Sequence, residues 1–89
     1  MSLLPELRVE IERIDEALLG LISDRIAVAH RVATAKRAAG LPVLDPGREA
    51  HVVRRAADFA RSNGLEEEDV RDLFWSLIGL TRRAELSPR

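Results

Sequence analysis

The 89-residue sequence contains no cysteine, which excludes disulfide bonds, thiolate nucleophiles and cysteine metal sites. Its two histidines, His30 and His51, are isolated and lack the spacing of metal ligands. The sequence also contains neither a glycine-rich phosphate loop nor a nucleophile elbow. We therefore expect no bound metal and no covalent chemistry on a thiol.

An excess of charge of one sign is also missing. The 14 basic and 15 acidic residues give a net charge of -1, so no basic field points to nucleic acid or to an anionic membrane. No window is long and apolar enough to span a bilayer, and the first residues do not resemble a signal peptide. We expect a cytoplasmic protein that binds neither nucleic acid nor membrane.

The alternation typical of β-strands is absent, whereas helical spacing is clear in three stretches. Pro5 suits the first turn of a helix that continues to Ala39, because Gly40 and Pro42 then end it. The hydrophobic content of 46% is sufficient for a core. The sequence therefore predicts an all-α protein with a long first helix.

Two shorter helices are expected to follow. Asp45 suits the cap of the second helix and Pro46 its first position, and Asn63-Gly64 ends it. The acidic residues at 66–69 are favourable at the positive end of a third helix, which Ser87-Pro88 ends. No linker or internal repeat divides the chain, so one domain is predicted.

The first helix carries the clearest pattern. Its apolar positions recur every 3.5 residues, as in helices that pack as coiled coils. The stripe comprises Leu7, Ile11, Ile14, Leu18, Leu21, Arg25, Val28, Val32 and Ala35. A helix of roughly 33 residues is about 50 Å long, whereas a compact domain of this size is roughly 30 Å across. A second copy would cover the stripe, so residues 1–89 are predicted to form an intertwined homodimeric helical bundle.

Arg25 interrupts the apolar stripe, and Arg8 and Lys36 lie near the same face. Arg25 and Lys36 are about 16 Å apart along the helix and about 20° apart around it, so they could hold an anion between them. Arg8 is about 25 Å from Arg25 and could reach only the site of a partner chain. Alternatively, Arg25 extends to solvent or pairs with an acidic residue of another helix.

Further candidates lie at the start of the second helix and the end of the third. Arg48 could bind a carboxylate, and Glu49 could orient Arg48 or accept a substrate hydroxyl. The two could equally form a surface salt bridge. Asp45 is a structural cap even if it also contacts a ligand. Glu85 continues an apolar stripe after Thr81, so it is either buried as a neutral or paired group or exposed by fraying of the helix.

These residues together resemble the all-helical class of chorismate mutases over nearly the whole chain. The matching residues are Leu7-Arg8, Ile14-Asp15, Leu18-Leu19, Arg25, Lys36 and the run from Pro42 to Glu49. That last run, at a fixed distance from Lys36, is the most specific part. The resemblance implies an intertwined helical dimer that converts chorismate to prephenate.

The resemblance implies that three cations of the first helix bind substrate. Arg8 from the other protomer and Arg25 would each bind a carboxylate, and Lys36 would contact a carboxylate and the ether oxygen. The reaction is a one-substrate pericyclic rearrangement that needs no nucleophile, metal or cofactor. The protein has to hold a dianion in its reactive conformer and stabilise the charge that develops on the ether oxygen.

The resemblance places the other candidates around the substrate ring. Asp45 and Glu49 would contact the ring hydroxyl, and Arg48 would lie at the edge of the site. Thr81 and Glu85 would complete the pocket from the third helix. Thr81 stands where serine is common in bacterial relatives, and Glu85 where many have glutamine. Because a glutamate donates a hydrogen bond only while protonated, we predict that activity falls as the pH rises and Glu85 ionises.

Three functions remain open at this point. The first is a chorismate mutase of phenylalanine and tyrosine synthesis, with no fused regulatory domain. The second keeps the fold and changes the substrate, because related helical proteins rearrange 4-amino-4-deoxychorismate or eliminate pyruvate from isochorismate. The third is a dimeric regulatory module without catalysis. The register of Arg8, Arg25, Lys36 and Arg48 with the apolar stripe argues against this third function.

Overall fold

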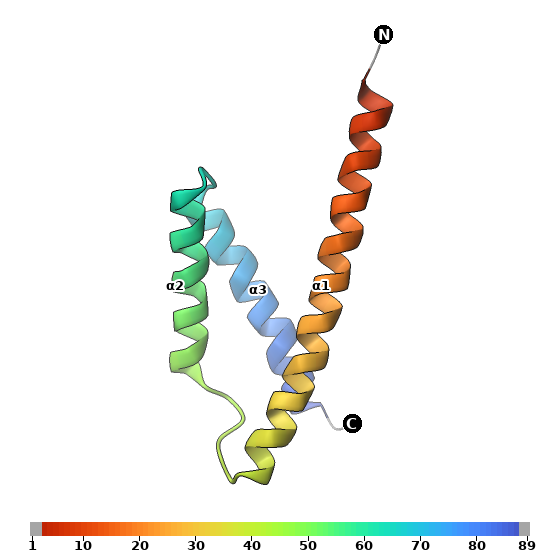
Figure 1. The fold of residues 1–89 in the computed structure, drawn as a ribbon. Helices are drawn as coiled ribbons and strands as arrows, with labels where there is room; N and C mark the ends of the chain where they lie inside the picture. Colours follow the sequence, from red (N-terminus) through yellow and green to blue (C-terminus); the bar gives the residue numbers. More distant parts are fainter. Residues whose placement is uncertain (1–2, 88–89) are drawn as a thin grey trace.

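The computed structural model describes residues 3–87, which form three α-helices and no β-strand (Figure 1). The first helix, α1, spans Leu4–Ala38, α2 spans Pro46–Ser62 and α3 spans Glu67–Leu86. The prediction of an all-α chain with a long first helix is therefore confirmed. The expected stop of the third helix at Pro88 lies outside the described residues, and α3 ends at Leu86.

In both loops a glycine in the left-handed conformation follows the C-cap residue of the preceding helix. Gly40 and Gly64 each have a φ of 71°, which residues with a side chain rarely adopt. After α1, the amide of Leu41 donates to the carbonyl of Lys36 at 2.9 Å, as in a Schellman motif. These turns end α1 and α2 and allow the chain to reverse direction.

Carboxylate caps open the two shorter helices. Oδ1 of Asp45 accepts a hydrogen bond from the amide of Arg48 at 3.1 Å, with proline in the first turn of α2. A side-chain oxygen of Glu66 accepts from the amide of Glu68 at 3.3 Å at the start of α3. The predicted cap at Asp45 is therefore present.

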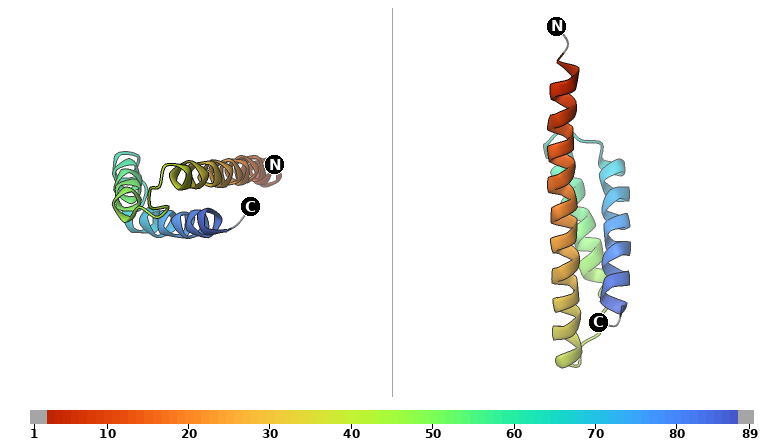
Figure 2. Two further views of the ribbon diagram at one scale, coloured as in Figure 1. Left: turned by 90° about the horizontal axis from the view of Figure 1, so that it is seen from below. Right: turned by 90° about the vertical axis from the view of Figure 1, so that its right-hand side faces the viewer.

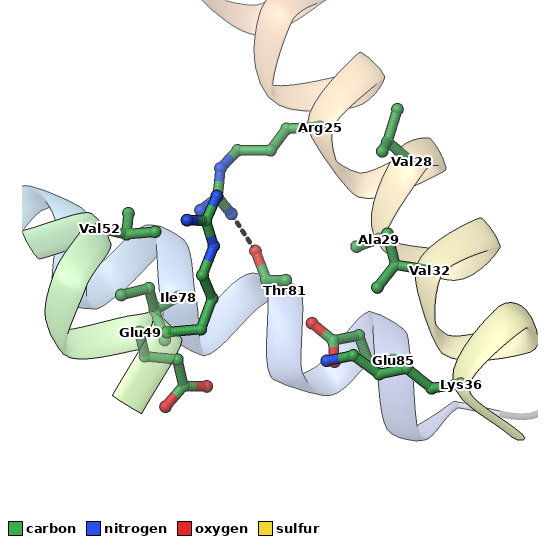
Figure 3. A pocket seen from close by; sticks show the side chains of 11 residues that line it. Arg25, Val28, Ala29, Val32, Lys36, Glu49, Val52, Ile78, Thr81 and Glu85 are labelled. Carbon is green, nitrogen blue, oxygen red and sulfur yellow. Dashed lines mark hydrogen bonds between the residues drawn. The ribbon is translucent and has the colours of Figure 1, made fainter. Parts of the chain in front are cut away.

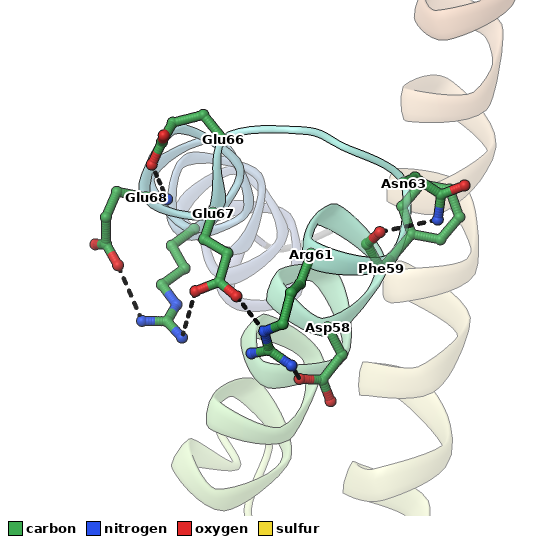
Figure 4. Close-up of polar contacts among 8 residues, drawn as sticks. Asp58, Phe59, Arg61, Asn63, Glu66, Glu67 and Glu68 are labelled. Atoms are coloured by element: carbon green, nitrogen blue, oxygen red, sulfur yellow. Dashed lines mark hydrogen bonds and ion pairs between the residues drawn. The ribbon is translucent and has the colours of Figure 1, made fainter.

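Ion pairs join the ends of α2 and α3 beside their turn (Figure 4). Arg61 contacts Glu67 at 2.5 Å and Asp58 at 3.2 Å, so its guanidinium connects the two helices. On α3, Arg71 contacts Glu68 at 3.1 Å. These side chains are 31–69% exposed, and ion pairs in contact with solvent contribute little to stability.

The core consists mainly of small side chains around α3. This helix runs obliquely from the C-terminal end of α2 to the C-terminal half of α1 and packs against both (Figure 1). Within residues 3–87, α1 and α2 make no close backbone contact with each other. The buried residues are Ala29, Ala33, Val53, Ala56, Ala57, Ala60, Ile78 and Ala84. Alanines let helix backbones approach closely, but they bury little apolar surface.

The single chain is extended and leaves much apolar surface exposed. Its radius of gyration is 16.5 Å, against about 12 Å expected for a compact chain of this length. The N-terminal part of α1 extends beyond both other helices (Figure 2). Along it, Leu7, Ile11, Ile14, Leu18 and Leu21 are 49–64% exposed. An apolar face of this extent is consistent with cover by another chain. None of the helices in the described part has an apolar stretch that could cross a membrane.

Candidate functional site

A cavity of about 260 Å³ lies where the C-terminal half of α1 faces α2 and α3 (Figure 3). Its lining residues come from all three helices: Arg25, Val28, Ala29, Val32, Lys36, Arg48, Glu49, Val52, Ile78, Thr81 and Glu85. Six of the eight candidates from the sequence are among them. The spacing explains this convergence, because residues three or four positions apart share one face of a helix.

Arg25 reaches across the cavity from α1 to α3. Its Nη1 donates a hydrogen bond to the hydroxyl of Thr81, which itself donates to the carbonyl of Leu77 at 2.9 Å (Figure 3). The sequence left open a pairing of Arg25 with a carboxylate. Within residues 3–87, no carboxylate lies at ion-pair distance from Arg25, so its charge is available to a bound anion.

Lys36 lies about 16 Å further along α1 than Arg25, near the same face of the helix. Its Nζ donates to the main-chain carbonyl of Val43 at 3.0 Å, which ties the lysine to the loop between α1 and α2. An ammonium group has three donors, so this contact leaves Lys36 able to donate to a ligand. Lys36 and Glu85 both project into the pocket (Figure 3).

The sequence left open a salt bridge between Glu49 and its neighbour Arg48. Among the described residues this pair is not formed. Glu49 accepts two hydrogen bonds from Arg82 of α3: Arg82 Nε donates to Oε2 at 2.8 Å, and Nη2 donates to Oε1. Sequence analysis did not identify Arg82. The available signal was its place four residues after Ile78, a spacing that puts both on one side of α3.

The charges around Glu49 keep it ionised. Hydrogen bonds from Arg82 are the largest cause that lowers the pKa of Glu49, and the charges of Arg82 and Lys36 act in the same direction. Burial and the charge of Asp45 oppose this shift without reversing it. Conversely, the hydrogen bond to Glu49 raises the pKa of Arg82. The Glu49 side chain is only 14% exposed, so the pair is partly shielded from solvent.

Glu85 lies in the last turn of α3, which continues to Leu86, so the helix does not fray before it. The residue is half-buried and lines the cavity. Arg37 of α1, which sequence analysis also missed, donates from Nη2 to the main-chain carbonyl of Glu85 at 2.6 Å. This contact satisfies a carbonyl that would otherwise lack a partner at the helix end and fixes Glu85 relative to α1.

Two sequence candidates do not line the cavity. Arg8 is exposed on the projecting part of α1, about 25 Å along the helix from Arg25. Asp45 is exposed beside the cavity and accepts the capping hydrogen bond from the Arg48 amide. Their assignment to the carboxylate and the ring hydroxyl of a substrate stays a prediction.

The arrangement favours an anionic ligand. The lining residues Arg25, Lys36 and Arg48 carry positive charge, and Arg82 balances Glu49 from behind the lining. Glu85 is then the remaining acidic side chain in the lining. The part of the chain that the structure describes contains no group of three or more side chains suited to hold a metal ion. The cations of the lining offer binding of an anion and charge stabilisation by fixed hydrogen-bond donors.

Residues 7–86 match the protein family described as chorismate mutase type II. The chain is 35% identical over 82 residues to 4-amino-4-deoxychorismate mutase of Streptomyces venezuelae, covering 92% of this chain and 80% of that protein. It is 33% identical over 75 residues to chorismate mutase of Methanocaldococcus jannaschii, covering 84% of this chain and 76% of that protein. It is also 42% identical over 55 residues to the bifunctional chorismate mutase/prephenate dehydratase of Aquifex aeolicus, covering 62% of this chain and 15% of that protein.

Proposed function

The chain belongs to the chorismate mutase type II family, and from this premise we propose that it rearranges chorismate to prephenate in the cytoplasm, within aromatic amino-acid biosynthesis. The observation that carries the proposal is the convergence of Arg25, Lys36 and Arg48 from two helices on one cavity. Chorismate carries two carboxylates. The three cations of the lining outnumber its acidic side chains, because Glu49 is already paired with Arg82, so positive charge remains to bind the substrate.

The proposed catalysis consists of positioning and charge stabilisation. Arg25, oriented by Thr81, binds one carboxylate and holds the substrate in its compact conformer, in which the reacting carbon atoms meet. As the ether bond breaks and the carbon–carbon bond forms, negative charge grows on the ether oxygen. Lys36 donates to that oxygen, and Glu85 adds a second donor while it is protonated. Arg48 assists from the edge of the site.

We further propose a homodimer in which Arg8 of each protomer completes the site of its partner. Three properties of the single chain support it: an extended shape, a core of mostly alanine, and an exposed apolar stripe on α1. Arg8 lies on that stripe's projecting end, so a partner that covers the stripe could also receive the arginine. An antiparallel pairing of the α1 helices would bring Arg8 toward the partner's cavity.

A second candidate substrate is 4-amino-4-deoxychorismate. It is favoured by the 35% identity to the Streptomyces venezuelae enzyme named for it, which extends over 92% of this chain. The two substrates differ by an amine in place of a hydroxyl, so the groups facing that substituent decide between them. Glu49 is the lining carboxylate that we assign to it.

The test is a comparison of substrates with the purified chain. Ultraviolet absorbance would follow the loss of chorismate, 4-amino-4-deoxychorismate and isochorismate under the same conditions. We expect chorismate to be consumed with the highest kcat/KM and prephenate to be the product. Consumption of none of the three would contradict the enzymatic function and favour a binding or regulatory module.

A further inference from the structure

Glu49 forms an ion pair with Arg82, a residue that the proposed reaction leaves unused. Glu49 is on α2 and Arg82 on α3, so the pair joins the two helices at the edge of the cavity. Glu49 lines the cavity whereas Arg82 does not, and their side chains are 14% and 43% exposed. The guanidinium therefore holds the carboxylate from outside the substrate's space (Figure 3 shows Glu49 across the pocket from Lys36 and Glu85).

The two-pronged contact fixes the chemical character of Glu49. An ionised carboxylate only accepts hydrogen bonds, and a planar guanidinium that binds both of its oxygens also restricts its orientation. The charges that face Glu49 are Arg82 and Glu85 on α3, Lys36 on α1, Asp45 before α2 and Arg48 beside it. Among these, Arg82 alone makes direct hydrogen bonds to Glu49.

The pair has no net charge, which affects two ring substituents differently. A hydroxyl is neutral and can still donate a hydrogen bond to a free lone pair of the carboxylate. An aliphatic amine is a cation at neutral pH and gains most from a carboxylate that is not already balanced. The positive charge of Arg82 opposes a second cation beside Glu49, so the pair disfavours an ammonium group.

We propose that Arg82 is a positioning residue that sets substrate specificity, because it holds Glu49 as a charge-balanced acceptor that favours a ring hydroxyl over a ring ammonium group. The inference rests on the proposed function and deepens it. It predicts that chorismate, which has a ring hydroxyl, is a better substrate than 4-amino-4-deoxychorismate, which has a ring amine. It also assigns a role to a residue that does not itself touch the substrate.

The experiment measures kcat/KM for both compounds in the wild-type chain, Arg82→Met and a matched control, Arg83→Met. Arg83 is exposed on the same helix and lies outside the cavity lining. We expect Arg82→Met to reduce kcat/KM for chorismate about tenfold, the loss typical of one charged hydrogen bond. The preference for chorismate over the amine should fall by a similar factor, while Arg83→Met leaves both values within about twofold of wild type.

A double-mutant cycle separates this role from a general stabilising one. If Arg82 acts through Glu49, then Arg82→Met should change the substrate preference in the wild type but not in a Glu49→Gln background. Arg82→Lys keeps the positive charge but loses the two parallel hydrogen bonds to Glu49, so it should retain most of the preference for the hydroxyl. Circular dichroism would check each fold, and Arg82→Gln would replace Arg82→Met if that variant does not fold.

The titration of Glu49 adds two readouts, the pH profile of kcat/KM and an NMR titration that needs no turnover. Arg82 lowers the pKa of Glu49, so its removal should raise that pKa, and the acidic limb of the kcat/KM profile should move to higher pH. Carbon-13 NMR of labelled glutamate would follow the Glu49 carboxyl group directly. An unmoved Glu49 titration, or an equal effect of Arg82→Met in the Glu49→Gln background, would overturn the inference.

The failure of this inference and that of the proposed function look different. A wild-type chain that consumes neither compound overturns the proposed function and the specificity assignment together. A wild-type chain that consumes chorismate while Arg82→Met keeps the same preference overturns only the role of Arg82. Turnover of chorismate with a lowered preference in Arg82→Met supports both.

Discussion

The two halves of α1 share one apolar pattern but lie in opposite surroundings. Every residue from 4 to 21 is exposed, and Ile14 and Leu18 are 59% and 52% exposed. The half from 22 to 38 contains the buried Ala29 and Ala33 and lines the cavity. Small residues let α3 pack closely against the second half of α1, whereas the leucines and isoleucines of the first half remain exposed among residues 3–87.

The comparison shows which parts of the proposed site one chain forms by itself and which parts need a partner chain. The second half of α1 and the hairpin of α2 and α3 form the cavity and most of its charges. The first half carries an apolar face and Arg8, which the same chain cannot use. An exposed apolar face of this length is typical of an interface, so the first half is the part that we assign to the partner.

The largest expected effect comes from a charge in the exposed half. Leu18→Asp would place a carboxylate in the proposed interface, where an unpaired buried charge costs about 3–5 kcal/mol. We expect the dimer to dissociate, helix content to fall and activity to disappear. Sedimentation equilibrium at low micromolar concentration, with circular dichroism, would measure this.

The control for this substitution is Ser23→Asp, which adds the same charge to the opposite face of α1. On a free surface either change would cost less than about 0.5 kcal/mol. A Leu18→Asp chain that sediments and folds like wild type would show that the first half of α1 is free surface, and the dimer would have to be abandoned. The same holds for a wild-type chain that is a folded monomer.

Arg25→Ala tests the half of α1 that forms the cavity. The variant should remain a folded dimer, because Arg25 is half-buried and binds only the Thr81 hydroxyl among the described residues. Loss of this cation should lower kcat/KM about 100-fold, the loss that a misplaced substrate can cause, because Arg25 is assigned to a carboxylate that holds the reactive conformer. Arg31→Ala, an exposed arginine of α1 outside the cavity lining, is the control. Wild-type turnover in Arg25→Ala would contradict the assignment.

Arg8→Ala connects the two halves. Each of the variants Arg8→Ala and Arg25→Ala should be nearly inactive by itself. When equal amounts are unfolded and refolded together, half of the dimers should be mixed, and each mixed dimer has one site with both arginines. Activity should therefore return to about a quarter of the wild-type value. If the mixture is no more active than its components, Arg8 does not serve the partner's site.

Much of the fold could be predicted from the sequence, because its signals are local. Gly40, Asp45 and Gly64 mark helix ends through backbone conformation and capping, which depend on a few neighbouring residues. The apolar stripe likewise predicted the long first helix. The same pattern could not show which half of the stripe α3 would cover, because that depends on the sizes of side chains on two helices.

The polar residues that line the cavity were predictable from the sequence, but their hydrogen-bond partners were not. Spacing along each helix placed Arg25 and Lys36 on one face of α1, as the structure shows. The contact of Glu49 with Arg82 and that of Arg37 with the Glu85 carbonyl depend on how far each helix is rotated about its axis. A change of rotation by one residue would bring different side chains together, and the sequence of one chain does not specify it.

The smallest expected effect concerns Glu85, the acidic residue of the lining that α3 holds against the cavity-forming half of α1. While protonated, it donates to the ether oxygen; once ionised, it repels the charge that develops there. Glu85→Gln, whose amide donates a hydrogen bond without needing an added proton, should raise kcat/KM by about tenfold. An unchanged kcat/KM in Glu85→Gln would exclude Glu85 as the donor and leave Lys36 to stabilise the ether oxygen without it.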